Sequence, residues 1–195
     1  MVKILVPTTV GRRKRMAQFI ASCGDNAGMP HQVIVFENAL GGYVKAIRLL
    51  AATCKPDDII MAANDDIVFG KNWLKILYTA FMGAFPDLDG LAMGDDGIHG
   101  DKHATLPLMT AGNFLKYCHA GYWHNFCDWE WYYIAKARGK FLYVPESKMI
   151  HEHWSVGKAE RDETYLLQAP YFETDSDLFW TRWALSDGFK KWETL

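Results

Sequence analysis

Apolar residues follow two different patterns along the first half of the chain. Short apolar runs predict three buried strands, at positions 3–6, 32–36 and 59–63. Segments with apolar residues three and four positions apart predict three helices, at positions 13–23, 43–54 and 73–81. Asn72 is placed to cap the third helix. Strands alternating with helices predict an α/β fold, with a mostly parallel sheet covered by helices on both faces.

The second half of the chain has shorter and less regular segments. Further strands are predicted at positions 91–93, 106–110, 141–144 and 148–150. A helix is predicted around Trp131, Ile134 and Ala135, and Gly139 is placed to end it. The aromatic-rich stretch from Asp175 onward predicts a C-terminal helix. We expect the apolar side chains of that helix, Trp180, Trp183 and Leu185, to pack mainly on the core, and contact with another subunit or with a membrane surface is the alternative.

Polar side chains follow the three predicted strands of the first half. Because ligands of parallel sheets bind beyond the carboxyl ends of the strands, we expect these side chains to share one edge. Two of them are adjacent carboxylates, whose charges about 4 Å apart repel by ~1 kcal/mol in water. A bound divalent cation would offset that repulsion, and an ordinary turn is the alternative. The three polar clusters are Pro7-Thr8-Thr9, Glu37-Asn38 and Asn64-Asp65-Asp66.

Composition narrows the classes of function. The 195 residues suit one domain, and the formal charge of −2 gives no electrostatic reason for a nucleic-acid partner. No apolar run reaches the roughly 18 residues of a membrane span, and the apolar N-terminus is too short for a signal peptide. The four cysteines lack metal-site spacing, so we expect free thiols in a cytoplasmic protein.

Four stretches, in this order, resemble glycosyltransferases of the GT-A type, close to the large inverting family 2. The stretches are VPTTVGRR from Val6, FENALGG from Phe36, NDDIVFGKNWL from Asn64, and CDWEWYYIAKARGKFLYVPESKMIH from Cys127. HEHWS, from His151, is similar to the metal-binding histidine segment of bacterial galactofuranosyltransferases. The third stretch departs from the family's Asp-x-Asp motif, because Asn64 stands at its first position.

The resemblance implies a GT-A, Rossmann-like α/β/α sandwich formed by one domain, residues 1–195. Residues 1–94 would be the nucleotide-binding half, residues 95–154 the acceptor and catalytic half, and residues 155–195 a lid with a helical tail. It also implies a sugar transfer from a nucleotide-diphosphate sugar, with UDP expected, to the hydroxyl group of a saccharide or another acceptor. No integral membrane segment is expected.

The resemblance further assigns roles to individual residues. Asp128 would be the general base, and Glu130 a second acid that positions the acceptor. Mn²⁺ or Mg²⁺ would be held by Asp66, with Asp65 and His151, and His153 is the alternative histidine. The residues implied in nucleotide-sugar binding are Pro7, Thr8, Thr9, Arg12, Arg13, Glu37, Asn38, Asn64, Asp65 and Lys158.

Alternatives stay open for several of these residues. Asp128 could cap the helix that begins there, and Arg12 and Arg13 could be part of a solvated helix start. Trp123 and Trp129 could stack on a sugar or belong to the core, and Asp95 and Asp96 could line an acceptor pocket or a solvated loop. Two rival functions are a non-catalytic sugar- or nucleotide-binding module and a metal-dependent hydrolase using His151 and His153. The remaining histidines show no supporting spacing, at His31, His99, His103, His119 and His124.

Overall fold

The computed structural model describes residues 1–37, 39 and 41–194, and these form a seven-stranded sheet in the order β2-β1-β3-β6-β5-β7-β4. β1 pairs in parallel with β2 and β3, and β5 pairs in parallel with β7, whereas β6 and β4 run in the opposite direction. The sheet is therefore mostly parallel, as predicted. The strands are β1 Val2–Thr8, β2 His31–Glu37, β3 Ile59–Ala62, β4 Ile67–Phe69, β5 Leu91–Asp95, β6 Leu108–Thr110 and β7 Phe141–His151.

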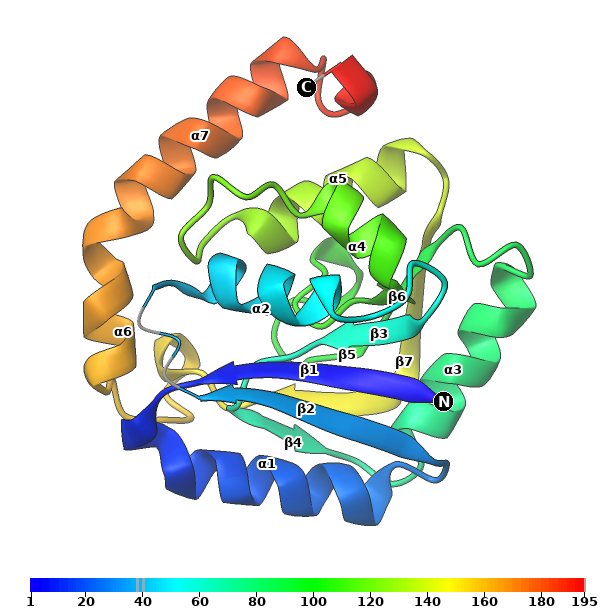
Figure 1. The fold of residues 1–195 in the computed structure, drawn as a ribbon, viewed down its shortest axis with the longest axis vertical. Helices are drawn as coiled ribbons and strands as arrows, with labels where there is room; N and C mark the ends of the chain where they lie inside the picture. The colour runs from blue at the N-terminus through cyan, green and yellow to red at the C-terminus, as the bar shows by residue number, and fades with distance from the viewer. Residues whose placement is uncertain (38, 40, 195) are drawn as a thin grey trace.

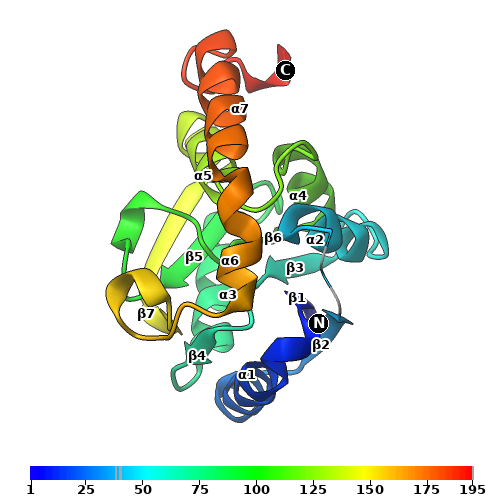
Figure 2. The same cartoon turned by 90° about the vertical axis from the view of Figure 1, so that its left-hand side faces the viewer.

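Helices cover both faces of this curled sheet, which gives an α/β/α arrangement. α1 (Arg13–Asn26) and α3 (Trp73–Ala84) lie on one face, and α2 (Tyr43–Ala52), α4 (Ala111–Tyr117) and α5 (Cys127–Ala137) lie on the other (Figure 1). α6 (Glu163–Gln168) and α7 (Phe172–Leu185) follow the edge where the parallel strands end (Figure 2). The short 3₁₀ turns are η1 Val10–Arg12, η2 Gly100–Lys102, η3 Trp154–Val156, η4 Ala169–Tyr171 and η5 Trp192–Thr194.

The central strands are buried on both faces, which explains their nearly continuous apolar sequence. Ile4, Leu5 and Val6 of β1 are fully buried. On the α1/α3 face, Trp73 stacks on Phe69 with ring centroids 4.1 Å apart. Such packing fixes the sheet beneath the loops that follow its strands.

Three local predictions need correction. β1 continues through Pro7, because β3 pairs only with its first part and leaves that side of Pro7 without a strand neighbour. Asn72 does not cap α3: its backbone is left-handed, with φ 59°, and its side chain makes no capping hydrogen bond. β7 is one strand, although the sequence predicts two, because Pro145 falls in the register shift of its pairing with β5, between Val144 and Lys148.

The C-terminal helix is present, but only some of its apolar side chains pack on the core. Trp183 packs against Tyr133, with ring centroids 4.6 Å apart. Trp180 and Leu185 remain 57% and 70% exposed, so the packing prediction is wrong for these two. None of the helices in the described part of the chain is both long and apolar enough to cross a membrane.

Candidate functional site

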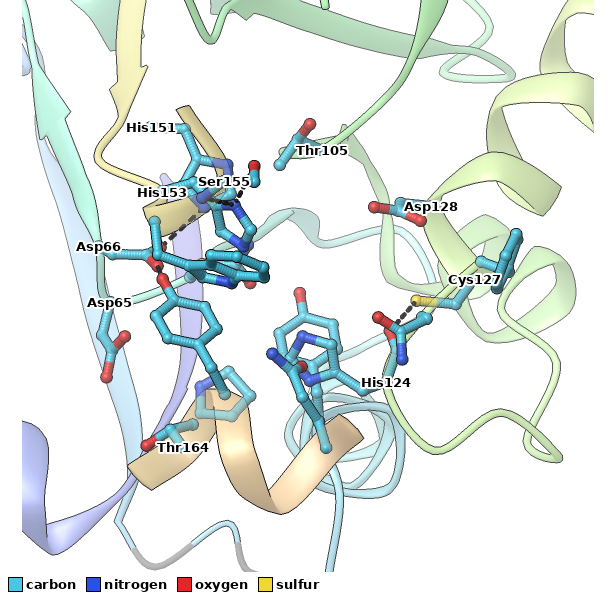
Figure 3. Close-up of a pocket in the computed structure, with 18 of the residues that line it drawn as sticks. Asp65, Asp66, Thr105, His124, Cys127, Asp128, His151, His153, Ser155 and Thr164 are labelled. Atoms are coloured by element: carbon cyan, nitrogen blue, oxygen red, sulfur yellow. Dashed lines mark hydrogen bonds and ion pairs between the residues drawn. The ribbon is translucent and has the colours of Figure 1, made fainter. Parts of the chain in front are cut away.

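One cavity of about 690 Å³ opens beyond the carboxyl ends of β1 and β3, where the sequence predicts a site (Figure 3). Its lining comes from both halves of the chain and from the α6 segment. The predicted residues that line it are Pro7, Thr8, Thr9, Arg12, Asn64, Asp65, Asp66, Asp128 and His151. The predicted residues that do not line it are Arg13, Glu37, Glu130 and Lys158. Asn38 lies outside the described residues.

The two adjacent carboxylates form a buried turn between β3 and β4. Arg12 Nη1 lies 2.6 Å from Asp65 Oδ1 and 3.7 Å from Asp66 Oδ2. The Thr8 hydroxyl donates a hydrogen bond of 2.6 Å to Asp65 Oδ2. The guanidinium of Arg12, itself buried, therefore offsets the repulsion between the carboxylates. Arg12 thus belongs to the site and not to a solvated helix start.

His151 and Tyr165 complete the surroundings of Asp66. His151 Nε2 lies 3.0 Å from Asp66 Oδ1, and the Tyr165 hydroxyl donates a 2.6 Å hydrogen bond to Oδ2. Burial alone would raise the pKa of Asp66, but His151, Tyr165 and Arg12 together hold it well below the ordinary value. The pKa of Asp65 is raised, because burial and the neighbouring Asp66 outweigh Arg12. Of the two carboxylates, Asp66 is therefore the one whose pKa is held low.

The donor atoms around Asp66 suit a divalent cation. Asp66 Oδ1 and His151 Nδ1 are buried and have no aligned hydrogen-bond partner among the described residues, although Oδ1 is within ion-pair distance of Nε2. A hard carboxylate oxygen with one imidazole is a donor set that Mn²⁺ accepts well. Asp65 differs, because both of its oxygens already accept hydrogen bonds. Asp66 and His151 are therefore the residues that fit a cation best.

His153 lies beside His151, with ring centroids 5.0 Å apart, and also lines the cavity. Its Nδ1 is 2.7 Å from the hydroxyl of Ser155. Burial and the adjacent His151 lower the pKa of His153 to about 4, so it is neutral near pH 7. Of the two histidines predicted as ligands, His151 is the one that contacts Asp66.

The segment before and through α6 closes one side of the cavity. Asp162 accepts a 2.9 Å hydrogen bond from Arg12 Nε, and Tyr165 lies with its ring 4.6 Å from the Arg12 guanidinium carbon. The positive group of the tail that reaches the cavity is Arg161, whereas Lys158 is exposed outside it. Contacts to Arg12 therefore hold α6 against the carboxylate turn.

Asp128 lies on the opposite wall of the cavity from Asp66 and His151 (Figure 3). α5 begins at Cys127 with Phe126 in the N-cap position, so Asp128 is not the N-cap residue, although its Oδ1 accepts a 3.0 Å hydrogen bond from the Trp129 amide in the first turn. The Asp128 side chain is 27% exposed, and His103 Nε2 is 3.2 Å from its Oδ2. Burial by itself would raise the pKa of Asp128. The opposing effects of His103, the Trp129 amide and His124 are together larger, so the pKa lies below its ordinary value.

Glu130 points away from the cavity. Its side chain is 1% exposed, accepts two hydrogen bonds from Arg182 at 2.8 and 2.9 Å, and accepts a third from the Tyr122 hydroxyl at 2.5 Å. Two residues along a helix lie about 200° apart, which is why Asp128 and Glu130 face different surroundings. Glu130 links α5 to α7, and its location gives no support to a role in positioning an acceptor.

α7 also fixes the loop that leads into α5. The buried carboxylate of Asp175 accepts hydrogen bonds from the backbone amides of Trp123, His124 and Asn125, at 2.8, 2.9 and 2.8 Å. Trp123 stacks on Tyr171, with ring centroids 3.9 Å apart. The loop is therefore tied to α7 immediately before Asp128. Trp129 lines the cavity, as does Trp131, whereas Trp123 does not.

Three histidines that sequence spacing does not single out also line the cavity: His99, His103 and His124. Burial lowers the pKa of His124 to about 4. The polar loop between β5 and β6, residues 96–107, brings in the other two. Its Asp96 is fully buried, whereas Asp95, the last residue of β5, pairs with Lys148 at 2.7 Å outside the cavity. The sequence signal for His99 and His103 is the polar composition of this loop.

Arg13 and Glu37 form an exposed pair away from the cavity. Arg13 Nε lies 3.1 Å from Glu37 Oε1, and the side chains are 72% and 51% exposed. The arginine that faces the carboxylates is the neighbouring Arg12, the last residue of η1, whereas Arg13 begins α1.

No protein-family model matches this sequence, and no curated protein matches it significantly.

Proposed function

We propose that this protein is an inverting, metal-dependent glycosyltransferase that uses a nucleotide-diphosphate sugar. One observation carries the proposal: Asp66 with His151, and Asp128, line opposite walls of the same cavity of about 690 Å³. A single displacement at a sugar carbon needs the leaving group on one side and a base on the other. The two walls supply residues suited to each side.

The chemistry follows from the two walls. The acceptor oxygen forms a bond to the anomeric carbon, the bond to the diphosphate oxygen breaks, and its electron pair leaves with the diphosphate. Asp128 takes the proton of the acceptor hydroxyl. A divalent cation held by Asp66 and His151 supplies positive charge to the diphosphate when bound.

The donor end of the cavity supports a diphosphate ligand. Arg12 and Arg161 bring guanidinium groups to the lining, and Thr8 and Thr9 add hydroxyl groups beside them. The cavity volume falls within the roughly 300–1,000 Å³ typical of small-molecule sites. We propose UDP as the nucleotide on the basis of the resemblance in the sequence. The GT-A assignment has the same basis.

A calorimetric titration of UDP tests the proposal. The binding constants are measured with and without Mn²⁺, beside GDP and CDP, for the native chain and for Asp66→Ala. Asp25→Ala is the matched control, because Asp25 is an exposed carboxylate on α1. Manganese-dependent UDP binding that is lost in Asp66→Ala and kept in Asp25→Ala is the expected result. Absence of nucleotide binding with any metal would overturn the proposed function.

A further inference from the structure

A chain of hydrogen-bonding side chains runs from the interior to Asp128. It begins at Asp96, passes through the Thr105 hydroxyl and the His103 ring, and ends 3.2 Å from Asp128 Oδ2. Asp96 and Thr105 come from the polar loop and its approach to β6, whereas Asp128 belongs to α5. The tertiary structure therefore connects Asp128 to a buried carboxylate on a separate segment of the chain.

Asp96 determines which group donates in the hydrogen bond between Asp96 and Thr105. Its fully buried carboxylate accepts from the amides of Ile98 and His99 at 2.9 and 2.8 Å, and from His99 Nδ1 at 2.8 Å. These contacts and the Thr105 hydroxyl, at 2.9 Å, hold the pKa of Asp96 far below its ordinary range despite its burial. An ionised carboxylate only accepts hydrogen bonds, so Thr105 donates its proton to Asp96.

The same proton cannot be donated twice. The Thr105 oxygen lies 2.9 Å from His103 Nδ1, and its hydrogen is already directed to Asp96. The hydroxyl oxygen therefore accepts, and Nδ1 carries a hydrogen. This assignment follows from the hydrogen-bond network around the ring.

The opposite ring nitrogen then faces a carboxylate. His103 is 3% exposed, and its buried Nε2 has no aligned hydrogen-bond partner among the described residues. Asp128 Oδ2, 3.2 Å away, is within ion-pair distance, although the alignment falls short of a hydrogen bond. With Nδ1 already protonated, a neutral ring would point a lone pair at an anionic oxygen. A proton on Nε2 removes that conflict.

Four ionisable groups near Asp128 have shifted pKa values that leave them neutral near pH 7. Burial lowers the pKa of His124 to about 4, which leaves it neutral. Burial also raises the pKa values of Tyr43 and Cys127, and that of Cys118 to about 12, so these are neutral as well. His99 lies against the His103 ring, at 4.5 Å between centroids, and its Nδ1 is directed to Asp96. Of the two histidines of this pair, His103 is the one within ion-pair distance of Asp128.

We propose that His103, oriented by Thr105 and Asp96, is a positioning residue that presents a protonated Nε2 to Asp128 and aims its carboxylate into the cavity. This inference rests on the proposed function, in which Asp128 is the base. Asp96, His99 and His103 also have metal-ligating side chains, with ligand atoms within 4.8 Å of one another. Both oxygens of Asp96 are already occupied by its hydrogen-bond donors, so we assign a hydrogen-bond chain to these residues and not a metal.

The pH dependence of sugar transfer, or of donor hydrolysis, distinguishes positioning from packing. The variants are His103→Gln and the matched control His31→Gln, because His31 begins β2 and does not line the cavity. We expect kcat to fall on the order of tenfold in His103→Gln, a part of the about 10²–10⁴-fold that a general base contributes. The acidic limb of kcat should also move to higher pH, because His103 helps to keep the pKa of Asp128 low. An acidic limb that does not move would overturn the proposal.

Nitrogen-15 NMR of the histidine rings gives a readout that needs no turnover. At neutral pH the native protein should show protons on both nitrogens of His103, and Asp128→Asn should lose the Nε2 proton. Thr105→Val should lower the population of the form with a proton on Nδ1. A His103 ring with a bare Nε2 in the native protein would overturn the proposal. If the NMR result holds while nucleotides fail to bind, the proposed function fails and the contact between His103 and Asp128 stands.

Discussion

Two aspartate–histidine pairs face each other across the cavity, and they differ in what else surrounds the carboxylate. On one wall, Asp66 lies 3.0 Å from His151, and on the other, Asp128 lies 3.2 Å from His103. The Asp66 side chain is 3% exposed and also meets Arg12 and Tyr165. The Asp128 side chain is 27% exposed, with its open side toward the cavity.

Under the proposed function, this difference would let the same pair of residue types serve two purposes. Asp66 is held ionised by several partners at once, which suits a group that must keep a negative charge beside a cation. Asp128 has one close charged partner and room for a ligand, which suits a group that gains a proton during a reaction. The surroundings, not the residue types, set the roles.

Asp128→Asn should give the largest effect, and it should distinguish turnover, which depends on Asp128, from nucleotide binding, which depends on Asp66. We expect kcat to fall by about 10²–10⁴-fold, because the amide cannot accept the acceptor proton. Nucleotide affinity should stay close to that of the native protein, since the Asp66 wall is intact. Steady-state kinetics and UDP calorimetry on one preparation measure both quantities. A parallel loss of nucleotide affinity would contradict the division between the walls.

Arg182→Met should destabilise the protein by removing the ion pair that holds α5, the helix carrying Asp128, against α7. Arg182 is the cation paired with the buried Glu130, and losing one partner of a buried ion pair typically costs about 3–5 kcal/mol. Urea unfolding measures the loss of unfolding free energy. The double variant Arg182→Met, Glu130→Gln should recover part of it, because the buried charge is then gone. A single-variant change as small as that of a surface pair would show that Arg182 does not support α5.

Tyr165→Phe should lower the free energy of unfolding by a smaller amount, through the loss of a hydrogen bond to Asp66. The change removes a buried hydroxyl that donates to an ionised carboxylate, a bond worth about 1.5–3 kcal/mol. Urea unfolding should show a loss of this order. Tyr171→Phe is the matched control, because Tyr171 acts through its ring, which stacks on Trp123. Equal losses in the two variants would mean that the hydroxyl of Tyr165 contributes nothing specific.

His124→Gln should give the smallest effect, visible only in acid. In the folded chain the pKa of His124 is about 4, below the ordinary 6.5, so the unfolded chain binds the proton more readily between these values. Stability is therefore lost as pH falls from about 6.5 toward 4, and the variant should lose less over this range. Thermal unfolding at several pH values measures the difference. Identical pH dependence in both proteins would contradict the pKa shift.

The sequence by itself determined the layer structure and one wall of the cavity. Short apolar runs and a period of three to four residues reveal which segments become buried strands and helices, since burial acts on local geometry. Carboxyl ends of parallel strands meet at one edge, so strand order alone is enough to group Thr8, Asp65 and Asp66. Pro7 and Asn72 show the limits of such local rules, because pairing and packing partners changed the expected boundary and cap.

Only the tertiary structure decided the partners of those groups. Arg12 rather than Arg13 meets the carboxylates because η1 sets the direction of each side chain. Glu130 turns to Arg182 because α7 docks on that side of α5, and His103 reaches Asp128 because a loop folds over the start of that helix. Periodicity shows that a position is buried, but an ion pair or a hydrogen bond depends on how distant segments pack together. That packing is set by the whole core, so no single stretch of the sequence contains it.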